Sequence, residues 1–147
     1  MRVVYVDTSA LGRVLLNEPD RPAIQRTLDE FDEVISSRLL WIELGRLARR
    51  KDLDSAASSS PARFVELAAE LLGAVTAIPM EGGAEGGEEG TLNDAITVPP
   101  FSVATLDAIH LATAVWMAGD FSIDFMTYDK RLAVGAREHG FTVVSPR

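Results

Sequence analysis

The sequence predicts an α/β fold built on a mainly parallel sheet of about five strands. Two observations lead to this prediction: apolar runs of strand length recur along the chain, and segments with helical periodicity lie between them. Strands that alternate with helices favour right-handed βαβ units, in which helices cover both faces of a parallel sheet. The carboxyl ends of the strands then meet at one edge, where open α/β sheets bind their ligands.

The expected elements follow from local patterns. Val3 to Val6 is a continuous apolar run, as a buried strand should be. Leu40, Leu44 and Leu47 share one helical face, and Pro61 suits the first turn of the helix that follows. The expected strands are residues 3–6, 34–35, 74–78, 124–127 and 141–144, and the expected helices are residues 9–16, 21–31, 39–52, 61–72, 106–118 and 130–139.

Residues 81–90 differ from the rest because they consist almost entirely of glycine and glutamate. Glycine-rich backbone loses much entropy on folding, and this segment offers almost no apolar surface to offset that loss. Its glycines also lack the Lys-Ser or Lys-Thr pair of a phosphate-binding P-loop. We therefore expect a flexible loop near residues 81–100.

Length and composition narrow the class of protein. At 147 residues the chain matches one domain of ordinary size, so we expect a single domain over residues 1–147. The absence of cysteine excludes disulfide frameworks, thiolate metal sites and cysteine nucleophiles. The sequence contains no signal-peptide pattern and no apolar stretch long enough to span a membrane. These features predict a cytoplasmic protein.

The formal charge of −8 argues against a protein that holds nucleic acid mainly by neutralising phosphates. Lysine and arginine are absent from residues 64–129, however, and they cluster at residues 46–51 and 130–137. A polyanion would therefore meet local basic rims around an acidic centre, provided that cations neutralise that centre. A solvated acidic surface explains the total charge equally well.

Two aspartates stand where a strand gives way to a helix. Asp7 follows the first strand and precedes Thr8 and Ser9, and Asp129 follows the strand that ends at Thr127. Either aspartate could simply be an N-cap, whose carboxylate accepts backbone N–H bonds and favours the helix dipole. Their shared place at the carboxyl edge also suits a functional site. The hydroxyl groups of Thr8, Ser9 and Thr127 would orient the carboxylates in such a site.

Glu43 lies on the helix of residues 39–52, about 40° from Leu47 and therefore on the flank of the buried stripe. One interpretation is an exposed pair with Arg46, three residues on, which is worth only a few tenths of a kcal/mol. The other is a ligand that faces inward, and the flanking position leaves both interpretations open.

Asp107 falls in the first turn of the helix of residues 106–118, which Thr105 can cap. The helix dipole favours acids there regardless of function. Small residues after Asp107 would let this helix pack closely on the sheet and fix the carboxylate. We expect His110, three residues on, to be a surface or capping histidine, because magnesium prefers oxygen ligands to imidazole.

Asp7, Glu43, Asp107 and Asp129 together suit a magnesium or manganese site. Such ions take oxygen ligands, and they activate water and stabilise developing charge on phosphate. Clustered carboxylates also repel one another, which raises their pKa values until a cation enters. Catalysis by a serine nucleophile fits less well, because the sequence has only two histidines and no G-x-S-x-G motif. The dinucleotide-binding motif G-x-G-x-x-G is also absent.

Four segments carry a family resemblance: Val-Asp-Thr-Ser-Ala-Leu (6–11), Trp-Ile-Glu-Leu (41–44), Leu-Asp-Ala-Ile-His-Leu-Ala-Thr-Ala (106–114) and Thr-Tyr-Asp-Lys-Arg-Leu (127–132). Each motif is weak alone, but the four occur in order over nearly the whole chain. Together they resemble the PIN-domain ribonucleases, and most closely the VapC toxins of bacterial toxin–antitoxin pairs.

The resemblance implies a PIN-like α/β/α sandwich and a magnesium- or manganese-dependent endoribonuclease that cuts RNA with an activated water. It also implies a homodimer silenced by a VapB-type antitoxin, whose basic tail would suit the negative charge. Residues 81–100 depart from the family pattern, which normally has a helix there. The site residues that the resemblance implies are the metal ligands Asp7 and Asp107, the further catalytic acids Glu43 and Asp129, and the supporting residues Thr8, Ser9 and Thr127.

A different class of function is a catalytically silent PIN-like module that binds a basic peptide or regulator in its acidic groove. The Gly/Glu-rich segment is its only positive support. A receiver-like phosphoacceptor fits less well, because the first strand ends in one acid rather than an acidic pair. The sequence predicts no particular RNA target, since nothing in it reads bases in a decodable way.

Overall fold

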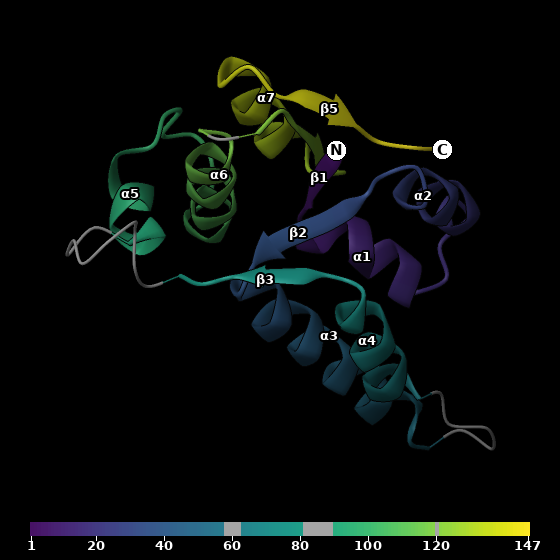
Figure 1. The fold of residues 1–147 in the computed structure, drawn as a ribbon. Helices are drawn as coiled ribbons and strands as arrows, with labels where there is room; N and C mark the ends of the chain where they lie inside the picture. The colour runs from purple at the N-terminus through teal and green to yellow at the C-terminus, as the bar shows by residue number, and fades with distance from the viewer. Residues whose placement is uncertain (58–62, 81–89, 120) are drawn as a thin grey trace.

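The computed structural model describes residues 1–57, 63–80, 90–119 and 121–147. In these residues five parallel strands form one sheet in the order β3-β2-β1-β4-β5. Helices pack on both of its faces, which is the expected PIN-like α/β/α sandwich (Figure 1). The strands are β1 (Val3–Val6), β2 (Glu33–Ser37), β3 (Thr76–Ile78), β4 (Ile123–Met126) and β5 (Thr142–Val144).

Seven helices occur in the described residues, and six of them agree with the expected helices to within a few residues. None of these helices is long and apolar enough to cross a membrane. The helices are α1 (Thr8–Leu15), α2 (Arg21–Leu28), α3 (Leu39–Ser55), α4 (Phe64–Gly73), α5 (Thr91–Thr97), α6 (Thr105–Met117) and α7 (Lys130–Glu138).

The helix α5 is the one that the sequence analysis missed. The expected flexible loop near residues 81–100 lies partly outside the described residues, which stop at Met80 and resume at Gly90. Directly after Gly90, Thr91 is buried and its hydroxyl donates to the carbonyl oxygen of Met80 at 3.1 Å. Ala95 of α5 also packs against the core. Tertiary packing therefore stabilises a short helix that local composition does not favour.

The central strand β1 is buried on both faces, as its continuous apolar sequence predicts. Side chains alternate along a strand, so Tyr5 packs with α6 and α7 while Val4 and Val6 pack with α1, α3 and α4. This placement sends the carboxyl end of β1 into the middle of one sheet edge. Any side chain that follows β1 is therefore surrounded by the ends of other elements.

The helix ends test the expected capping. Asp7 caps α1 by accepting from the Ala10 amide at 3.1 Å, and Asp129 caps α7 by accepting from the Leu132 amide at 2.8 Å, so both capping predictions are confirmed. Thr105 does not cap α6. That helix begins at Thr105 itself, after Ala104 in extended backbone, and has no side-chain cap.

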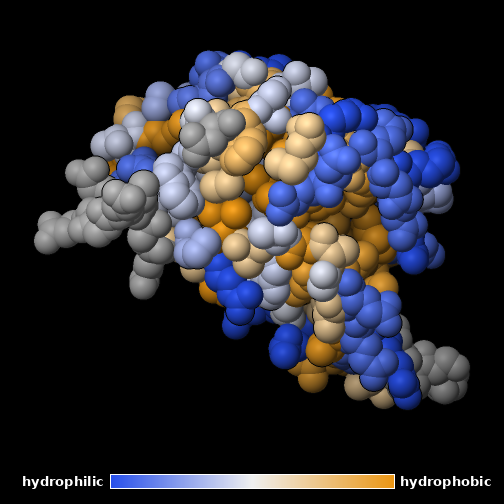
Figure 2. Space-filling view, in the orientation of Figure 1, coloured by the Kyte–Doolittle hydropathy of each residue, from blue (hydrophilic) through white to orange (hydrophobic). Residues whose placement is uncertain are grey.

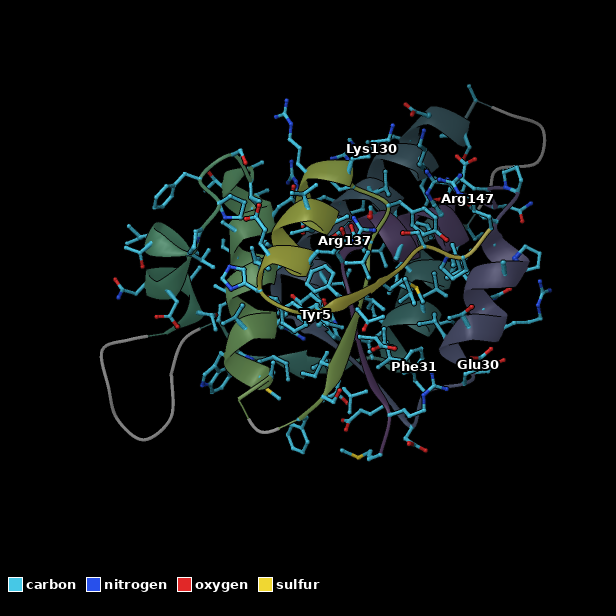
Figure 3. All side chains as sticks on the ribbon, turned by 90° about the horizontal axis from the view of Figure 1, so that it is seen from above. Tyr5, Glu30, Phe31, Lys130, Arg137 and Arg147 are labelled. Atoms are coloured by element: carbon cyan, nitrogen blue, oxygen red, sulfur yellow. The ribbon has the colours of Figure 1, made fainter. Side chains whose placement is uncertain are left out.

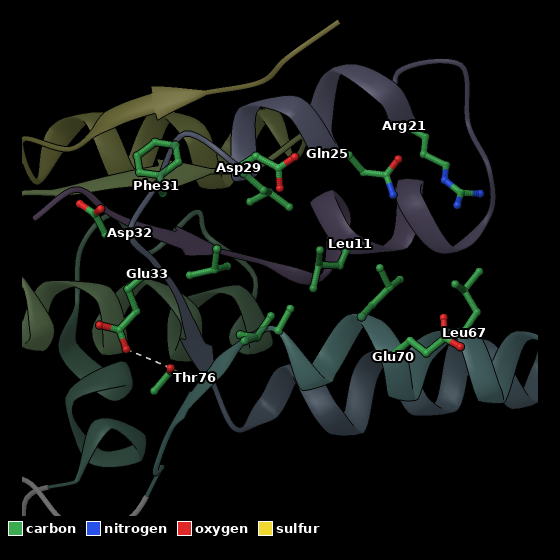
Figure 4. A pocket seen from close by; sticks show the side chains of 15 residues that line it. Leu11, Arg21, Gln25, Asp29, Phe31, Asp32, Glu33, Leu67, Glu70 and Thr76 are labelled. Atoms are coloured by element: carbon green, nitrogen blue, oxygen red, sulfur yellow. Dashed lines mark hydrogen bonds between the residues drawn. The ribbon is translucent and has the colours of Figure 1, made fainter.

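An open groove of about 1010 Å³ lies between α2 and α4 and reaches the amino ends of β2 and β3 (Figure 4). Figure 2 shows hydrophobic side chains gathered in this hollow. The apolar residues that line the groove are Leu11, Leu28, Phe31, Val34, Leu67, Leu71, Ala74 and Val75. The charged ones are Arg21, Asp29, Asp32, Glu33 and Glu70.

Candidate active site

Asp7 is held rigidly at the carboxyl end of β1, with only 2% of its surface exposed. Its Oδ1 accepts from the Ser9 hydroxyl at 2.7 Å and from the Ala10 amide, and its Oδ2 accepts from the Thr127 hydroxyl at 2.7 Å. Burial raises the pKa of Asp7, and the charge of His110 and these hydrogen bonds offset part of that effect. The carboxylate is therefore both a helix cap and an inward-facing acid.

The loop between β4 and α7 is tied to Asp7 through two hydroxyl groups. Ser9 Oγ accepts from the Tyr128 amide at 2.8 Å, and Thr127 Oγ1 accepts from the Asp129 amide at 3.1 Å. Each hydroxyl therefore accepts from the loop backbone while it donates to the Asp7 carboxylate. Ser9 and Thr127 thus position Asp7 and hold Asp129 beside it.

Glu43 faces inward and does not pair with Arg46: the described residues contain no such ion pair. Its Oε1 accepts from the Thr8 hydroxyl at 2.7 Å and lies 2.7 Å from His110 Nε2. Partial burial alone would raise the pKa of Glu43, but the hydrogen bonds and charge of His110 and the bond from Thr8 outweigh burial and lower it. Glu43 is therefore ionised at neutral pH.

The expectation that His110 is a surface or capping residue is wrong. His110 is 1% exposed, and its Nδ1 lies 2.7 Å from the hydroxyl of Tyr5 (labelled in Figure 3). That hydroxyl accepts from the Ser37 amide at 3.0 Å, so its own proton is free for Nδ1. Both ring nitrogens of His110 therefore have a partner, Tyr5 at Nδ1 and Glu43 at Nε2.

Tyr5 and His110 are the residues of the site that the sequence analysis missed. One signal was available: Asp107, His110 and Ala114 follow helical spacing of three and four residues, and Ala114 belongs to the core. Tyr5 is likewise the single side chain with a polar group in a buried central strand, and a buried tyrosine hydroxyl requires a partner. Both signals need the strand order before they identify the contact.

Asp107 is partly exposed, in the first turn of α6. Burial raises its pKa to about 6, together with the negative charges of Asp129, Asp7 and Glu43, while His110 acts in the opposite direction. The other three acids grouped from the sequence are therefore close enough to Asp107 to act on it at the carboxyl edge of the sheet.

The carboxylates are the ligand type that a hard divalent cation prefers, but their side chains do not form a complete coordination group. In the part of the chain that the structure describes, no three aspartate, glutamate or histidine side chains form a group that could hold a metal. Magnesium commonly binds through one or two carboxylates and keeps several waters. Two carboxylates with raised pKa values, Asp7 and Asp107, fit that mode of binding.

Comparisons with known proteins give the family of the chain. The PIN domain family matches residues 4–138. The chain is 32% identical to Ribonuclease VapC47 of Mycobacterium tuberculosis (strain CDC 1551 / Oshkosh) over 98% of its own length and 97% of the relative. It is also 32% identical to Ribonuclease VapC46 of Mycobacterium tuberculosis (strain ATCC 25618 / H37Rv), over 99% of both chains.

A solved structure supports the fold. The crystal structure of VapBC2 from Rickettsia felis, bound to a DNA fragment from their promoter, contains a chain that superposes with a TM-score of 0.66, over 99% of each chain at 9% identity. With the family match over most of the chain and two full-length relatives above 30% identity, the sequence belongs to the PIN-domain family and, within it, to the VapC proteins.

Proposed function

We propose that this protein is a magnesium- or manganese-dependent endoribonuclease that hydrolyses RNA phosphodiester bonds with an activated water. The observation that carries the proposal is the convergence of negative charge on Asp107, since Asp129, Asp7 and Glu43 all raise its pKa. Repulsion of this kind favours a bound cation. The ribonuclease names of both full-length relatives support RNA as the substrate.

In this proposal Asp7 and Asp107 hold the ion, which when bound makes a nucleophile of its water and offsets charge on the phosphate. Thr8, Ser9 and Thr127 keep the carboxylates in place. Both hydrogen bonds of Glu43 go to Oε1, and in the described residues Oε2 has no protein donor. Glu43 Oε2 is therefore available to accept a hydrogen bond from the attacking water.

The substitutions Asp107→Asn and Asp7→Asn test the proposal. Each should lower divalent-dependent RNA cleavage by about 10³-fold, because a neutral amide cannot bind the ion as a carboxylate does. The matched control is Asp94→Asn, which changes an exposed aspartate in the first turn of α5. The control should cleave RNA as the wild type does, and all three variants should keep the wild-type circular dichroism spectrum.

Undiminished cleavage in Asp107→Asn, or in the wild type after chelation of divalent ions, would contradict the proposal. The catalytically silent module predicts something else: no cleavage by any form, and tight binding of a basic peptide that Asp107→Asn weakens.

We further propose that the protein acts in the cytoplasm as a homodimer and is silenced by a VapB-type antitoxin. The solved relative is a VapBC pair, and the groove between α2 and α4 offers an apolar surface of the kind that partners cover. Four acids line it against one arginine, which suits an amphipathic partner with basic flanks.

A charge placed on the floor of the groove tests the partner. Leu71→Glu should leave RNA cleavage within about 2-fold of the wild type, because the groove is separate from the active-site acids Asp7, Glu43, Asp107 and Asp129. The same variant should escape inhibition by a VapB-type antitoxin that silences the wild type, and normal inhibition would exclude the groove as the docking surface. Sedimentation of the wild type tests the homodimer.

A further inference from the structure

We propose that a basic pocket beside the four acids binds a phosphate of the RNA strand that neighbours the cleaved one. The inference rests on the proposed function, which supplies the RNA. The pocket has a volume of about 360 Å³ and is bordered by α1, the β4–α7 loop, α7 and the segment after β5. The residues that matter are Arg13, Thr127, Asp129, Lys130, Arg137 and Arg147.

Two parts of the chain, α7 and the segment after β5, bring unpaired cations to this pocket. Lys130 and Arg137 are seven residues apart on α7, so both lie on the face that lines it. Arg147 follows β5 and lines the same pocket, and Figure 3 labels all three residues. The segment that carries Arg147 is fastened to the β4–α7 loop, because the Ser145 hydroxyl donates to the Thr127 carbonyl at 2.6 Å.

The charge of these cations is not neutralised within the protein. In the described residues no carboxylate forms an ion pair with Lys130, Arg137 or Arg147. Arg13 differs, because it pairs with Asp20 at 2.9 Å and lies over the Tyr128 ring at 4.3 Å. A chain of formal charge −8 thus gathers three unpaired cations around one small pocket, which is the arrangement that a phosphate requires.

The pocket and the acidic site share a wall. Thr127 lines the pocket and donates to Asp7, and Asp129 lines the pocket and raises the pKa of Asp107. When an RNA strand has one phosphodiester at the active-site acids, an adjoining phosphate therefore lies at Lys130 and Arg137. This continuity favours RNA over an acidic peptide as the occupant, because the same polyanion would meet cations at both places.

The test uses binding rather than cleavage. Lys130→Gln/Arg137→Gln is made on the Asp107→Asn background, and the dissociation constant for a fluorescent single-stranded RNA is measured against salt concentration. At about 0.1 M salt the double substitution should weaken binding by about 10-fold or more. Loss of this one phosphate contact should also reduce the slope of log K against log salt by about 0.7, the value for each single-strand contact.

The matched control removes two exposed arginines outside both basic clusters, as Arg26→Gln/Arg63→Gln on α2 and directly before α4. It lowers the net charge equally and should change binding by no more than about 2-fold. Equal weakening by both pairs would overturn the pocket and leave only a general charge effect. Unfolding temperatures within a few degrees of the background protein show that α7 is intact.

Two further results separate the pocket from the proposed function. RNA binding that is insensitive to Lys130→Gln/Arg137→Gln, while poly-glutamate binding depends on it, would assign the pocket to an acidic protein segment and overturn the inference. In the active enzyme the double variant should raise KM about 10-fold with kcat within about 2-fold. Wild-type cleavage that does not need divalent ions would overturn the proposed function alone, with the binding result unaffected.

Discussion

The Asp7 half and the Glu43 half of the site are built in different ways. Asp7 takes two of its three donors from Ser9 and Ala10, within three residues along the chain. Glu43 is held by Thr8 and His110, which are 35 and 67 residues away, and His110 in turn meets Tyr5 over 105 residues. The first half is local capping chemistry, whereas the second half exists only after the sheet has formed.

The largest expected effect comes from His110, the centre of the long-range half. The amide of an asparagine at this position can lie near the position of Nδ1 and keep the hydrogen bond with Tyr5. The longer glutamine can reach the position of Nε2 and keep the hydrogen bond with Glu43. His110→Asn and His110→Gln should each lower the free energy of unfolding by about 2–3 kcal/mol, because each leaves a buried group without a partner.

Cleavage should separate these two variants. If the role of His110 is to orient Glu43, His110→Gln should keep at least about 10-fold more activity than His110→Asn, measured as kcat at saturating RNA. Equal kcat values in the two variants would mean that the His110–Glu43 bond is structural only.

The differences between the two halves also explain what sequence could predict. The capping roles of Asp7 and Asp129 can be predicted from sequence, because an aspartate between an apolar run and a helix has a defined capping geometry. The strand alternation likewise predicts the parallel sheet. The contact between Tyr5 and His110 depends on which strand lies under α6, and one sequence contains no such information. The helix α5 was missed for the same reason, since packing stabilises it.

A smaller effect is expected in the Asp7 half, at Thr127, which is its one donor from a distant part of the chain. Thr127→Val keeps the shape of the side chain but removes the donor to Asp7 and the acceptor of the Asp129 amide. We expect a loss of about 1–3 kcal/mol in the free energy of unfolding and about 10-fold lower cleavage. The control is Thr142→Val on the exposed surface of β5, which should change stability by less than about 0.5 kcal/mol. Equal losses in both variants would contradict the assigned role.

A pH-dependent effect should follow from Asp107. Its pKa is raised to about 6 in the folded protein, against about 3.9 in the unfolded chain. Below about pH 4 both states hold the proton, so the carboxyl group has no effect on stability. As pH rises from about 4 to 6 the unfolded chain releases its proton more readily, and the native state is progressively destabilised.

The measurement compares the thermal unfolding of wild type and Asp107→Asn without divalent ions. The unfolding temperature of the variant should exceed that of the wild type by an amount that grows between about pH 4 and 6 and then stays constant. Magnesium should reduce the difference by stabilising the wild type. A difference that shrinks as pH rises would have the wrong sign for a raised pKa.

The smallest effect concerns the Glu43–Arg46 ion pair, which the sequence allowed. In the structure Glu43 contacts Thr8 and His110 instead. Arg46 is exposed and forms no ion pair with Glu43, so Arg46→Gln should change the free energy of unfolding by less than about 0.5 kcal/mol. Thr8→Val removes a hydrogen bond to a charged, partly buried carboxylate and should cost more, about 1–2 kcal/mol. A larger loss from Arg46→Gln than from Thr8→Val would mean that Glu43 is held from its own helix. The distinction between a local and a long-range half of the site would then fail.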